Sequence, residues 1–317
     1  MTNKEKEFYS KPFLFSYSSL NKLIHSPVLF YKDYILNEKE EKLEKHLING
    51  KLLHCLLFEP ENLNNKFKII PDKIPTDNVL KIMHKLAKTH LMYDLMDINL
   101  QTPILNILKE ENLYQSFKED SVRLNKIQCN ENKKYWDYIN DPKIDVIDQE
   151  TLKLSQEQLN FIKADLNIMN TLSKDDGEVF YEKYLECKIK DKAFGLKGVI
   201  DFYKINHTNK VVTICDLKTT SKSIEEFEET VYYYNYWLQS SIYCKLVYNN
   251  IKNQDYKFEY KFIVIDKYNQ VYLFDVSDKT LNNWSISLIE FLDIADYHYS
   301  NNNYKLPYKL LTSKIVL

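Results

Sequence analysis

Two short runs in the second half of the chain decide the fold: Gly198-Val199-Ile200-Asp201 and Asp216-Leu217-Lys218-Thr219-Thr220. Each run is typical of a β-strand that carries an acidic residue among β-branched and apolar neighbours. Acidic side chains are rarely buried unless an opposite charge or a metal ion compensates for the lost water. The two runs therefore predict neighbouring strands with a candidate site for chemistry between them.

Asp216 and Lys218 are two residues apart on a strand, so their side chains share one face. Asp201 lies on the preceding strand, which a hairpin connection would place alongside. Two neighbouring carboxylates repel each other, and Mg²⁺ or Mn²⁺ would relieve that repulsion. Two acids and a lysine are then sufficient for metal-assisted hydrolysis of a phosphodiester, with Lys218 orienting water or offsetting charge on the phosphate. Taken alone, the Asp-x-Lys triplet favours another interpretation, a salt bridge on a solvated edge strand.

A histidine upstream has a setting that suits a ligand. Leu47, Gly50, His54 and Leu57 fall on one face of a helix predicted over 40–58. Gly50 would allow another backbone to approach beside His54, and the imidazole could then bind a metal ion or a phosphate. Without further information, a core histidine is the more common interpretation.

Glutamates on a third strand are further candidates. Glu182 and Glu186 share a face of the strand that pairs with the strand of Asp201. One of them would join the metal site, or both would be exposed and without a role, which is the more common outcome.

A long helix predicted over 231–248 follows the catalytic strands. Gln239 and Tyr243 are four residues apart, with Tyr236 on the same face, so they would reach a substrate phosphate or pack behind the strands. The run from Tyr232 to Trp237 is rich in tyrosine. Such a run can stack on nucleic-acid bases, although packing is the commoner role.

The remaining pattern alternates helices and strands. A helix over 16–36 is predicted to begin at Ser18 or Ser19 and to break near Ser26-Pro27, and 60–75 is predicted to be an extended connector. Strands are predicted over 178–190, 196–205 and 210–217, a hairpin over 258–266 and 270–276, and helices after Ser223 and over 279–298. This order predicts an α/β or α+β fold with a mixed sheet. Residues 77–175 are mainly helical and polar, which predicts a helical insertion.

Composition excludes several classes of protein. The chain has 317 residues, of which 44% are hydrophobic, and a net charge of -2, so it lacks the general basic charge of many nucleic-acid binders. A local basic groove remains compatible with a DNA substrate. The sequence shows no apolar run of bilayer length and no signal-peptide pattern at its start, which predicts a cytoplasmic protein without a membrane partner. Its five dispersed cysteines argue against a disulfide framework, a zinc ribbon or a four-cysteine iron–sulfur site.

The order of these motifs resembles the PDDEXK nuclease superfamily in its RecB-like branch, and most closely the exodeoxyribonuclease VIII (RecE-like) group of phages and prophages. The resemblance is carried by Ser16-Tyr17-Ser18-Ser19-Leu20, Ser26-Pro27 with Phe30-Tyr31, Gly50 to His54 with Glu59-Pro60, Gly198-x-x-Asp201, Asp216-x-Lys218-Thr219-Thr220 and Gln239-x-x-x-Tyr243. It covers about 15–60 and 180–250. It implies a restriction-endonuclease-like core with a mixed central sheet flanked by helices, here one nuclease domain over 1–317 with its catalytic core at 178–298.

The resemblance also implies roles for individual residues. His54, Asp201, Asp216 and the carbonyl of Leu217 would bind Mg²⁺ or Mn²⁺, and Lys218 would be the catalytic lysine. Gln239 and Tyr243 would support the site or touch DNA, and Glu182 would be the motif glutamate. Some relatives hold an iron–sulfur cluster with one early and three late cysteines. Here Ser26 takes the early place and no cysteine follows Cys244, so we expect no cluster.

These arguments lead to one expected function and two alternatives. We expect a metal-dependent deoxyribonuclease that acts as a double-strand exonuclease on linear duplex DNA. The resemblance further implies phage-type recombination in a bacterial or phage-infected cell, with a single-strand annealing partner and a homo-oligomer. The alternatives are an endonuclease or nickase on the same core, and a non-catalytic DNA-binding protein that retains the fold.

Overall fold

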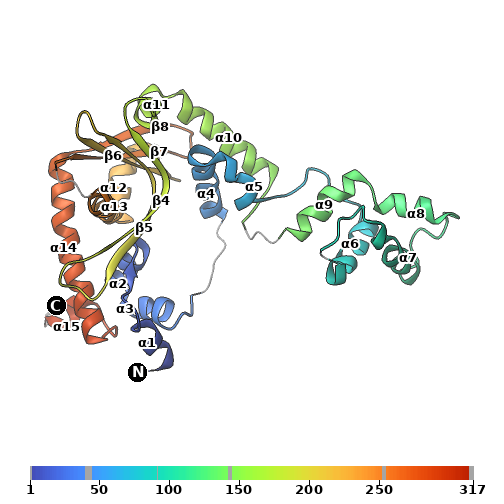
Figure 1. The fold of residues 1–317 in the computed structure, drawn as a ribbon, viewed down its shortest axis with the longest axis horizontal. Helices are drawn as coiled ribbons and strands as arrows, with labels where there is room; N and C mark the ends of the chain where they lie inside the picture. Colours follow the sequence, from blue (N-terminus) through green and yellow to red (C-terminus); the bar gives the residue numbers. More distant parts are fainter. Residues whose placement is uncertain (1, 40–44, 91, 142–144, 252–254, 314–317) are drawn as a thin grey trace. The chain divides into compact units, whose positions relative to one another are not determined.

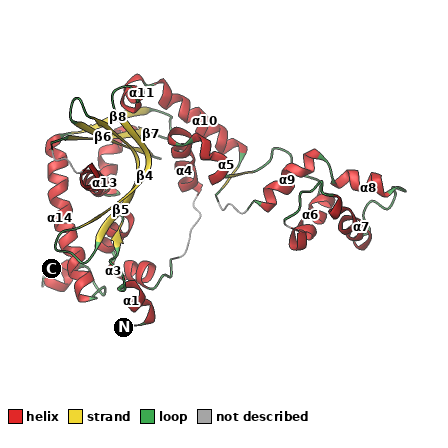
Figure 2. Cartoon of the chain, viewed as in Figure 1, coloured by secondary structure: helices red, strands yellow, loops and turns green. Residues whose placement is uncertain are grey.

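The structure is a computed structural model that describes residues 2–39, 45–90, 92–141, 145–251 and 255–313. The chain divides into two units. The first unit consists of Met1–Glu44, Leu57–Glu59 and Gln158–Leu317, and the second of Lys45–Leu56 and Pro60–Glu157. Helix α4 (Lys45–Phe58) begins in the second unit, and its last residues belong to the first. Figures 1 and 2 show the elements along the chain.

The first unit is built on a mixed sheet of six strands in the order β1-β5-β6-β7-β8, with β4 also paired to β5. Antiparallel pairs join β4 to β5, β5 to β6 and β7 to β8, whereas β1 with β5 and β6 with β7 are parallel. The strands are β1 (Leu14–Phe15), β4 (Glu178–Lys188), β5 (Gly195–Asn206), β6 (Val211–Thr219), β7 (Lys257–Ile265) and β8 (Val271–Val276).

One edge of β5 is only partly paired with other strands. β4 pairs with β5 along most of its length on the other edge. On the open edge, Phe202–Asn206 pair with β6, while Gly195 and Leu196 pair with β1. The stretch 197–200 lies between these two pairings, and Asp201 stands at its border. Asp216, on β6, follows directly after Cys215, the last residue of β6 that pairs with β5.

Helices flank this sheet, as Figure 1 shows, with α13 (Tyr236–Ile251) between the strands and α14 (Asp278–Asn301). Gly198 permits the close approach of α13 to β5, because a Cβ there would lie only 3.0 Å from a ring carbon of Tyr243 and 3.1 Å from Leu246. The core between sheet and helices is apolar and includes Leu196, Ile200, Ile214, Leu238, Ile242 and Phe262. The other helices of this unit are α1 (Asn3–Phe8), α2 (Tyr17–His25), α3 (Pro27–Phe30), the π-helix Tyr31–Ile35, α11 (Leu166–Leu172), the 3₁₀ turn Ile224–Glu226, α12 (Phe227–Tyr233) and α15 (Tyr308–Thr312).

The second unit is mainly helical and has a core of its own. Val79, Ile82, Met83 and Leu86 follow the spacing of an amphipathic helix and are buried on α6 (Asp77–His90). Trp136 is buried with them, and its indole N–H donates to the carbonyl of Tyr93 at 2.8 Å. The other elements are the 3₁₀ turns Pro60–Asn62 and Ile98–Leu100, α5 (Leu63–Lys66), α7 (Gln101–Glu110), α8 (Asp120–Ile127), α9 (Asn130–Asn140) and the parallel pair β2 (Lys68–Ile69) and β3 (Val146–Ile147); α10 (Gln149–Ala164) runs from this unit into the first.

The predicted fold class, a mixed sheet flanked by helices, is confirmed, and three local predictions are corrected. Ser16, not Ser18 or Ser19, caps α2, since its hydroxyl accepts from the backbone N–H of Ser19. The connector over 60–75 contains a 3₁₀ turn, α5 and β2. The helix predicted over 231–248 is two helices, separated where Asn235 adopts a left-handed φ of 57°.

The start of the helix predicted over 40–58 lies partly outside the described residues, at 40–44. In the part of the chain that the structure describes, no helix is both long enough and apolar enough to cross a bilayer.

Candidate active site

Two carboxylates stand opposite each other on β4 and β5. The register pairs Tyr181 with Phe202 and Lys183 with Ile200, which sets Glu182 opposite Asp201. Glu182 has a φ of 43°, in the left-handed region that L-residues adopt at a cost of about 1–2 kcal/mol. A carboxylate oxygen of Glu182 lies within 4.8 Å of one of Asp201. Strain of this kind gathers at functional sites, and here it accompanies a close pair of like charges.

A third carboxylate continues this row on β6. The β5–β6 register ends with Phe202 opposite Cys215, and one further step sets Asp201 opposite Asp216. There the backbone N–H of Leu217 donates to Oδ2 of Asp201 at 3.0 Å. Glu182, Asp201 and Asp216 therefore occupy successive strands at one level of the sheet, beside its open edge.

Lys218 and Gln239 hold the carboxylate of Asp216. Nζ of Lys218 lies 2.5 Å from Oδ2 of Asp216, and Nε2 of Gln239 donates to Oδ1 at 3.3 Å. Gln239 also accepts from Lys218 at 2.9 Å and donates to the hydroxyl of Tyr243 at 2.9 Å. Asp216 is fully buried on an interior strand. The ion pair with Lys218 that the alternative interpretation predicted is therefore present, but its predicted location on a solvated edge strand is wrong.

The charges of the site change the pKa of two of its members. Burial acts to lower the pKa of the Lys218 ammonium, but the carboxylates of Asp216 and Asp201 outweigh it, and the pKa is raised. Lys218 is therefore a permanent cation at neutral pH. Burial, reinforced by the charges of Asp201 and Asp216, raises the pKa of Tyr243, which keeps its hydroxyl protonated.

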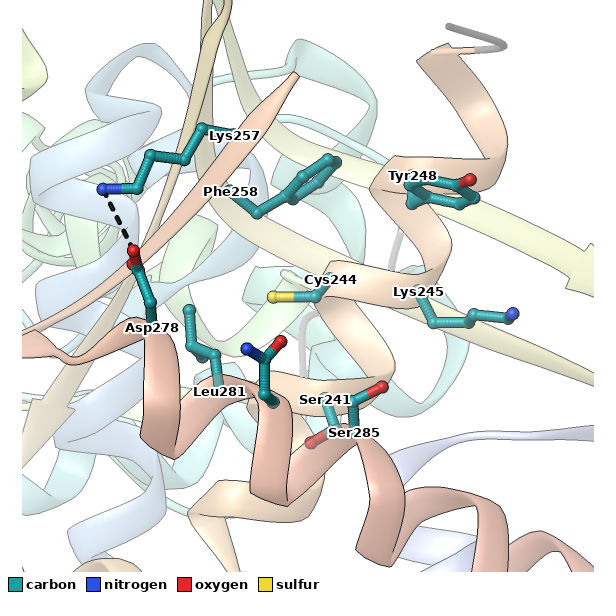
Figure 3. Close-up of a pocket in the computed structure, with 10 residues that line it drawn as sticks. Ser241, Cys244, Lys245, Tyr248, Lys257, Phe258, Asp278, Leu281 and Ser285 are labelled. Carbon is teal, nitrogen blue, oxygen red and sulfur yellow. Dashed lines mark ion pairs between the residues drawn. The ribbon is translucent and has the colours of Figure 1, made fainter. Parts of the chain in front are cut away.

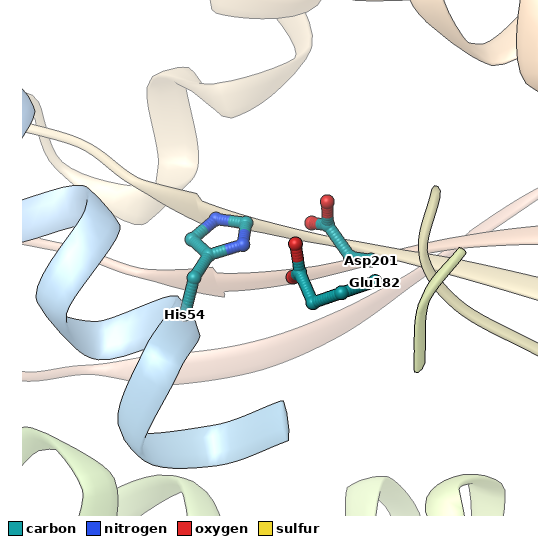
Figure 4. A group of neighbouring side chains, drawn as sticks. All are labelled: His54, Glu182 and Asp201. Carbon is teal, nitrogen blue, oxygen red and sulfur yellow. The ribbon is translucent and has the colours of Figure 1, made fainter. Parts of the chain in front are cut away.

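Figure 4 draws His54 of α4 together with Glu182 and Asp201, a group of three side chains that could hold a metal ion. Helix α4 ends at Phe58, whose ring packs against Tyr181 and Phe202, with centroids 6.2 and 6.4 Å apart. These two residues are the chain neighbours of Glu182 and Asp201, and His54 precedes Phe58 by about one helical turn.

The donor set of this group is two carboxylates and an imidazole, which are ligands that divalent metal ions use in proteins. Asp216 is not one of the three residues, and the carbonyl of Leu217 stays a prediction as a ligand. Glu186 lies away from the group: it is exposed, accepts from the hydroxyl of Tyr184 at 3.0 Å and stands opposite Lys197.

Sequence reasoning did not single out Tyr17. Its hydroxyl donates to the carbonyl of Tyr234, and burial, with the charges of Tyr236 and Asp216, raises its pKa. The ring of Tyr236 lies beneath Lys218, with Nζ 4.6 Å from the ring centroid. A tyrosine among serines at the start of a helix offers no chemical signal by itself, so only the folded chain places Tyr17 here.

A separate cavity of about 610 Å³ lies between α13, β7 and α14 (Figure 3). Cys244, Tyr248, Phe258 and Leu281 contribute to its walls, and Lys257 forms an ion pair with Asp278 at its rim, at 3.4 Å. None of its lining residues is a member of the carboxylate row, so we do not assign it to the same site.

Comparison with known proteins gives matches among solved structures. No family model matches the chain, and no curated protein does. One similar solved structure is a "putative exonuclease" from Eubacterium rectale, with 12% identity over 99% of both chains and a TM-score of 0.48. Another is the protein SSO0001, with 13% identity over 75% of this chain and 96% of that chain and a TM-score of 0.23.

Proposed function

We propose that the chain is a metal-dependent deoxyribonuclease of the PDDEXK type. The observation that carries the proposal is the row of Glu182, Asp201 and Asp216 on three adjacent strands, with the cation of Lys218 at its end. Neighbouring carboxylates repel one another unless an opposite charge compensates for them. A divalent ion explains both the excess negative charge and its location.

Each residue has a role in this proposal. Glu182, Asp201 and His54 bind the ion, and Asp216 faces it from the neighbouring strand. A bound Mg²⁺ or Mn²⁺ would polarise the scissile phosphate and make a water nucleophilic at neutral pH. Lys218 offsets the negative charge that develops on the phosphate during in-line attack, which leaves a 5′-phosphate. Gln239 is a positioning residue, because it holds both Asp216 and Lys218.

The substrate in this proposal is linear duplex DNA, degraded from its ends. The RecE-like pattern in the sequence supports this choice over the endonuclease alternative, and a recombination role with an annealing partner and a homo-oligomer rests on the same pattern. The metal site itself would serve either mode of cleavage.

The experiment offers the purified chain two substrates with Mg²⁺: end-labelled linear duplex and closed circular DNA. We expect loss of the linear duplex from its ends, survival of the circle, and no cleavage by the Asp201→Asn variant. Rapid linearisation of the circle would replace the exonuclease with an endonuclease. Binding of duplex without cleavage in Mg²⁺ or Mn²⁺ would favour the non-catalytic alternative.

A further inference from the structure

An unusual set of exposed aromatic rings lies beside the carboxylate row. Tyr233 and Tyr234, at the end of α12, are 74% and 48% exposed, although tyrosine rings are mostly buried in a core or an interface. Their rings meet edge to face with centroids 4.8 Å apart. Tyr234 in turn stacks on Tyr236, at 5.7 Å and an interplanar angle of 26°. We call Tyr233, Tyr234 and Tyr236 the aromatic track.

The track leads from solvent to the proposed catalytic lysine. Its inner ring, Tyr236, lies 4.6 Å from Nζ of Lys218, which contacts Asp216. Its outer ring, Tyr233, lies 5.9 Å from Nζ of Lys222. A series of ring contacts, one edge to face and one stacked, therefore connects the surface with the site of the proposed chemistry.

The backbone that carries the track is fixed in place. Asn235, between the second and third rings, has the left-handed φ of 57° that separates α12 from α13. Its amide donates to Oδ1 of Asn21 at 2.8 Å, and its own Oδ1 accepts from the indole of Trp237 at 2.9 Å. Tyr17 holds the carbonyl of Tyr234. Rings held in this way bind a flat ligand without the cost of ordering a loop.

We propose that the aromatic track binds the unpaired bases of a single DNA strand and guides that strand to the carboxylate row. This inference rests on the proposed nuclease function and specifies its substrate: a strand end separated from its complement. Every base has a flat face that stacks on an aromatic ring, so the track would bind without regard to sequence.

The charge around the track indicates which part of the strand it contacts. The same segment carries Glu225, Glu226, Glu228 and Glu229, and Lys222 lies 3.8 Å from Glu226. Phosphates are repelled by such a segment, whereas base faces are not. The track therefore contributes base stacking. Contacts to the phosphates, which release counterions from DNA on binding, are made by other residues.

The test measures binding of a fluorescein-labelled oligothymidylate of about 20 nucleotides to the full chain by fluorescence anisotropy, in EDTA so that nothing is cut. Tyr233→Ala should weaken binding by about 5- to 150-fold, which corresponds to 1–3 kcal/mol for one lost base stack. Tyr233→Trp should restore binding. Tyr268→Ala is the matched control, since Tyr268 is 64% exposed on the turn between β7 and β8, and it should bind like the wild type.

A second ligand separates stacking from other effects. The wild type should bind an oligonucleotide with abasic sites as weakly as Tyr233→Ala binds the oligothymidylate. The affinity of Tyr233→Ala should be the same for both ligands. The slope of log affinity against log salt should be equal for both proteins, because the tyrosine contacts no phosphate.

Several outcomes would overturn the inference. Equal affinity of Tyr233→Ala and wild type for the oligothymidylate would do so. So would a wild-type dimer that the substitution converts to a monomer, since the track would then be covered by a second copy. Tighter, tyrosine-dependent binding of oligouridylate would reassign the track to RNA. Cleavage of labelled duplex, measured on the same preparations, tests the proposed nuclease function separately. If the wild type cuts the duplex and Tyr233→Ala binds the oligothymidylate with wild-type affinity, only the proposed role of the aromatic track is wrong.

Discussion

Nζ of Lys218 and Oδ2 of Asp216 lie 2.5 Å apart within the interior strand β6, where the two side chains are 13% and 1% exposed. Because the pKa of Lys218 is raised, this is an ion pair at neutral pH. A buried pair of this kind adds little net stability when it is complete, since both charges have lost their water. Removal of Lys218 leaves Asp216 without this cation, and removal of Asp216 leaves Lys218 with only the charge of Asp201 to balance it. The contribution of the pair can therefore be measured from its single and double variants.

We expect Lys218→Met and Asp216→Asn each to lower the free energy of unfolding by about 3–5 kcal/mol without metal. The double variant should lose clearly less than the sum of the two, because it removes both members of the pair together. Urea unfolding in EDTA measures all three, and the difference gives the coupling energy.

Lys257→Met is the control for this cycle. Lys257 pairs with Asp278 at 3.4 Å on the surface, with both side chains more than half exposed, so its loss should cost no more than about 1 kcal/mol. Strict additivity at Asp216 and Lys218 would show that the two charges do not depend on each other. All three site variants should fail to cut DNA, whatever their stability.

Substitution by glycine should have opposite effects on stability at Glu182 and at Glu186. Glu182→Gly should raise the stability of the metal-free protein by about 1 kcal/mol, because glycine adopts a φ of 43° without strain and the repulsion with Asp201 disappears. Glu186→Gly, on the same strand with ordinary backbone, should lower it by about 0.5–1 kcal/mol. Unfolding in EDTA compares the two, and a loss at both positions would remove the strain argument. With Mg²⁺, the wild type should gain stability that Glu182→Gly does not.

The strands of the first unit could be predicted from the sequence because hydrophobic alternation and turn residues are local signals. The three strands from 178 to 217 were expected within about two residues of their ends. The break at Asn235 could not be predicted in this way. It depends on contacts with Asn21 and Trp237, and an aromatic run continues through it without any change of pattern. The division into one nuclease domain with an insertion at 77–175 stays a prediction.

The sequence singles out candidate residues for a site but not how they are arranged, and their roles stay predictions. Asp201, Asp216 and Lys218 stood out because charged residues within apolar strands are rare. The strand pattern alone does not separate Glu182 from Glu186, although the family resemblance favours Glu182. The register sets Glu182 opposite Asp201 and Glu186 opposite Lys197. The metal-binding roles of His54, Asp201, Asp216 and Leu217 and the catalytic role of Lys218 stay predictions.

His298 predicts a dependence of stability on pH outside the candidate site. It is fully buried on α14, and its Nδ1 donates to the carbonyl of Asn303 at 2.5 Å. Burial lowers its pKa, although the bond to Asn303 opposes the shift. The unfolded chain therefore takes up a proton near pH 6.5, while the folded chain takes it up only at lower pH, so the free energy of unfolding should fall as the pH drops below about 6.5.

Urea unfolding on both sides of this pH checks the prediction. His298→Gln should flatten the acid dependence, and His207→Gln, at an exposed position, should leave it unchanged. A wild-type stability that rises on acidification through this range would contradict the buried neutral imidazole.

His54 gives the most direct test of the proposed metal site. Helix α4 ends at Phe58 on the rings beside Glu182 and Asp201, and His54 is the residue of that helix that offers a nitrogen donor to them. We expect His54→Ala to lower the affinity for Mn²⁺ at least about tenfold, or 1.4 kcal/mol, because one coordinating group is lost. Calorimetric titration with Mn²⁺ measures this, with His84→Ala on α6 as the control. If Asp201→Asn abolishes binding while His54→Ala binds Mn²⁺ like the wild type, the ion is held by carboxylates and His54 has another role, such as contact with the phosphate.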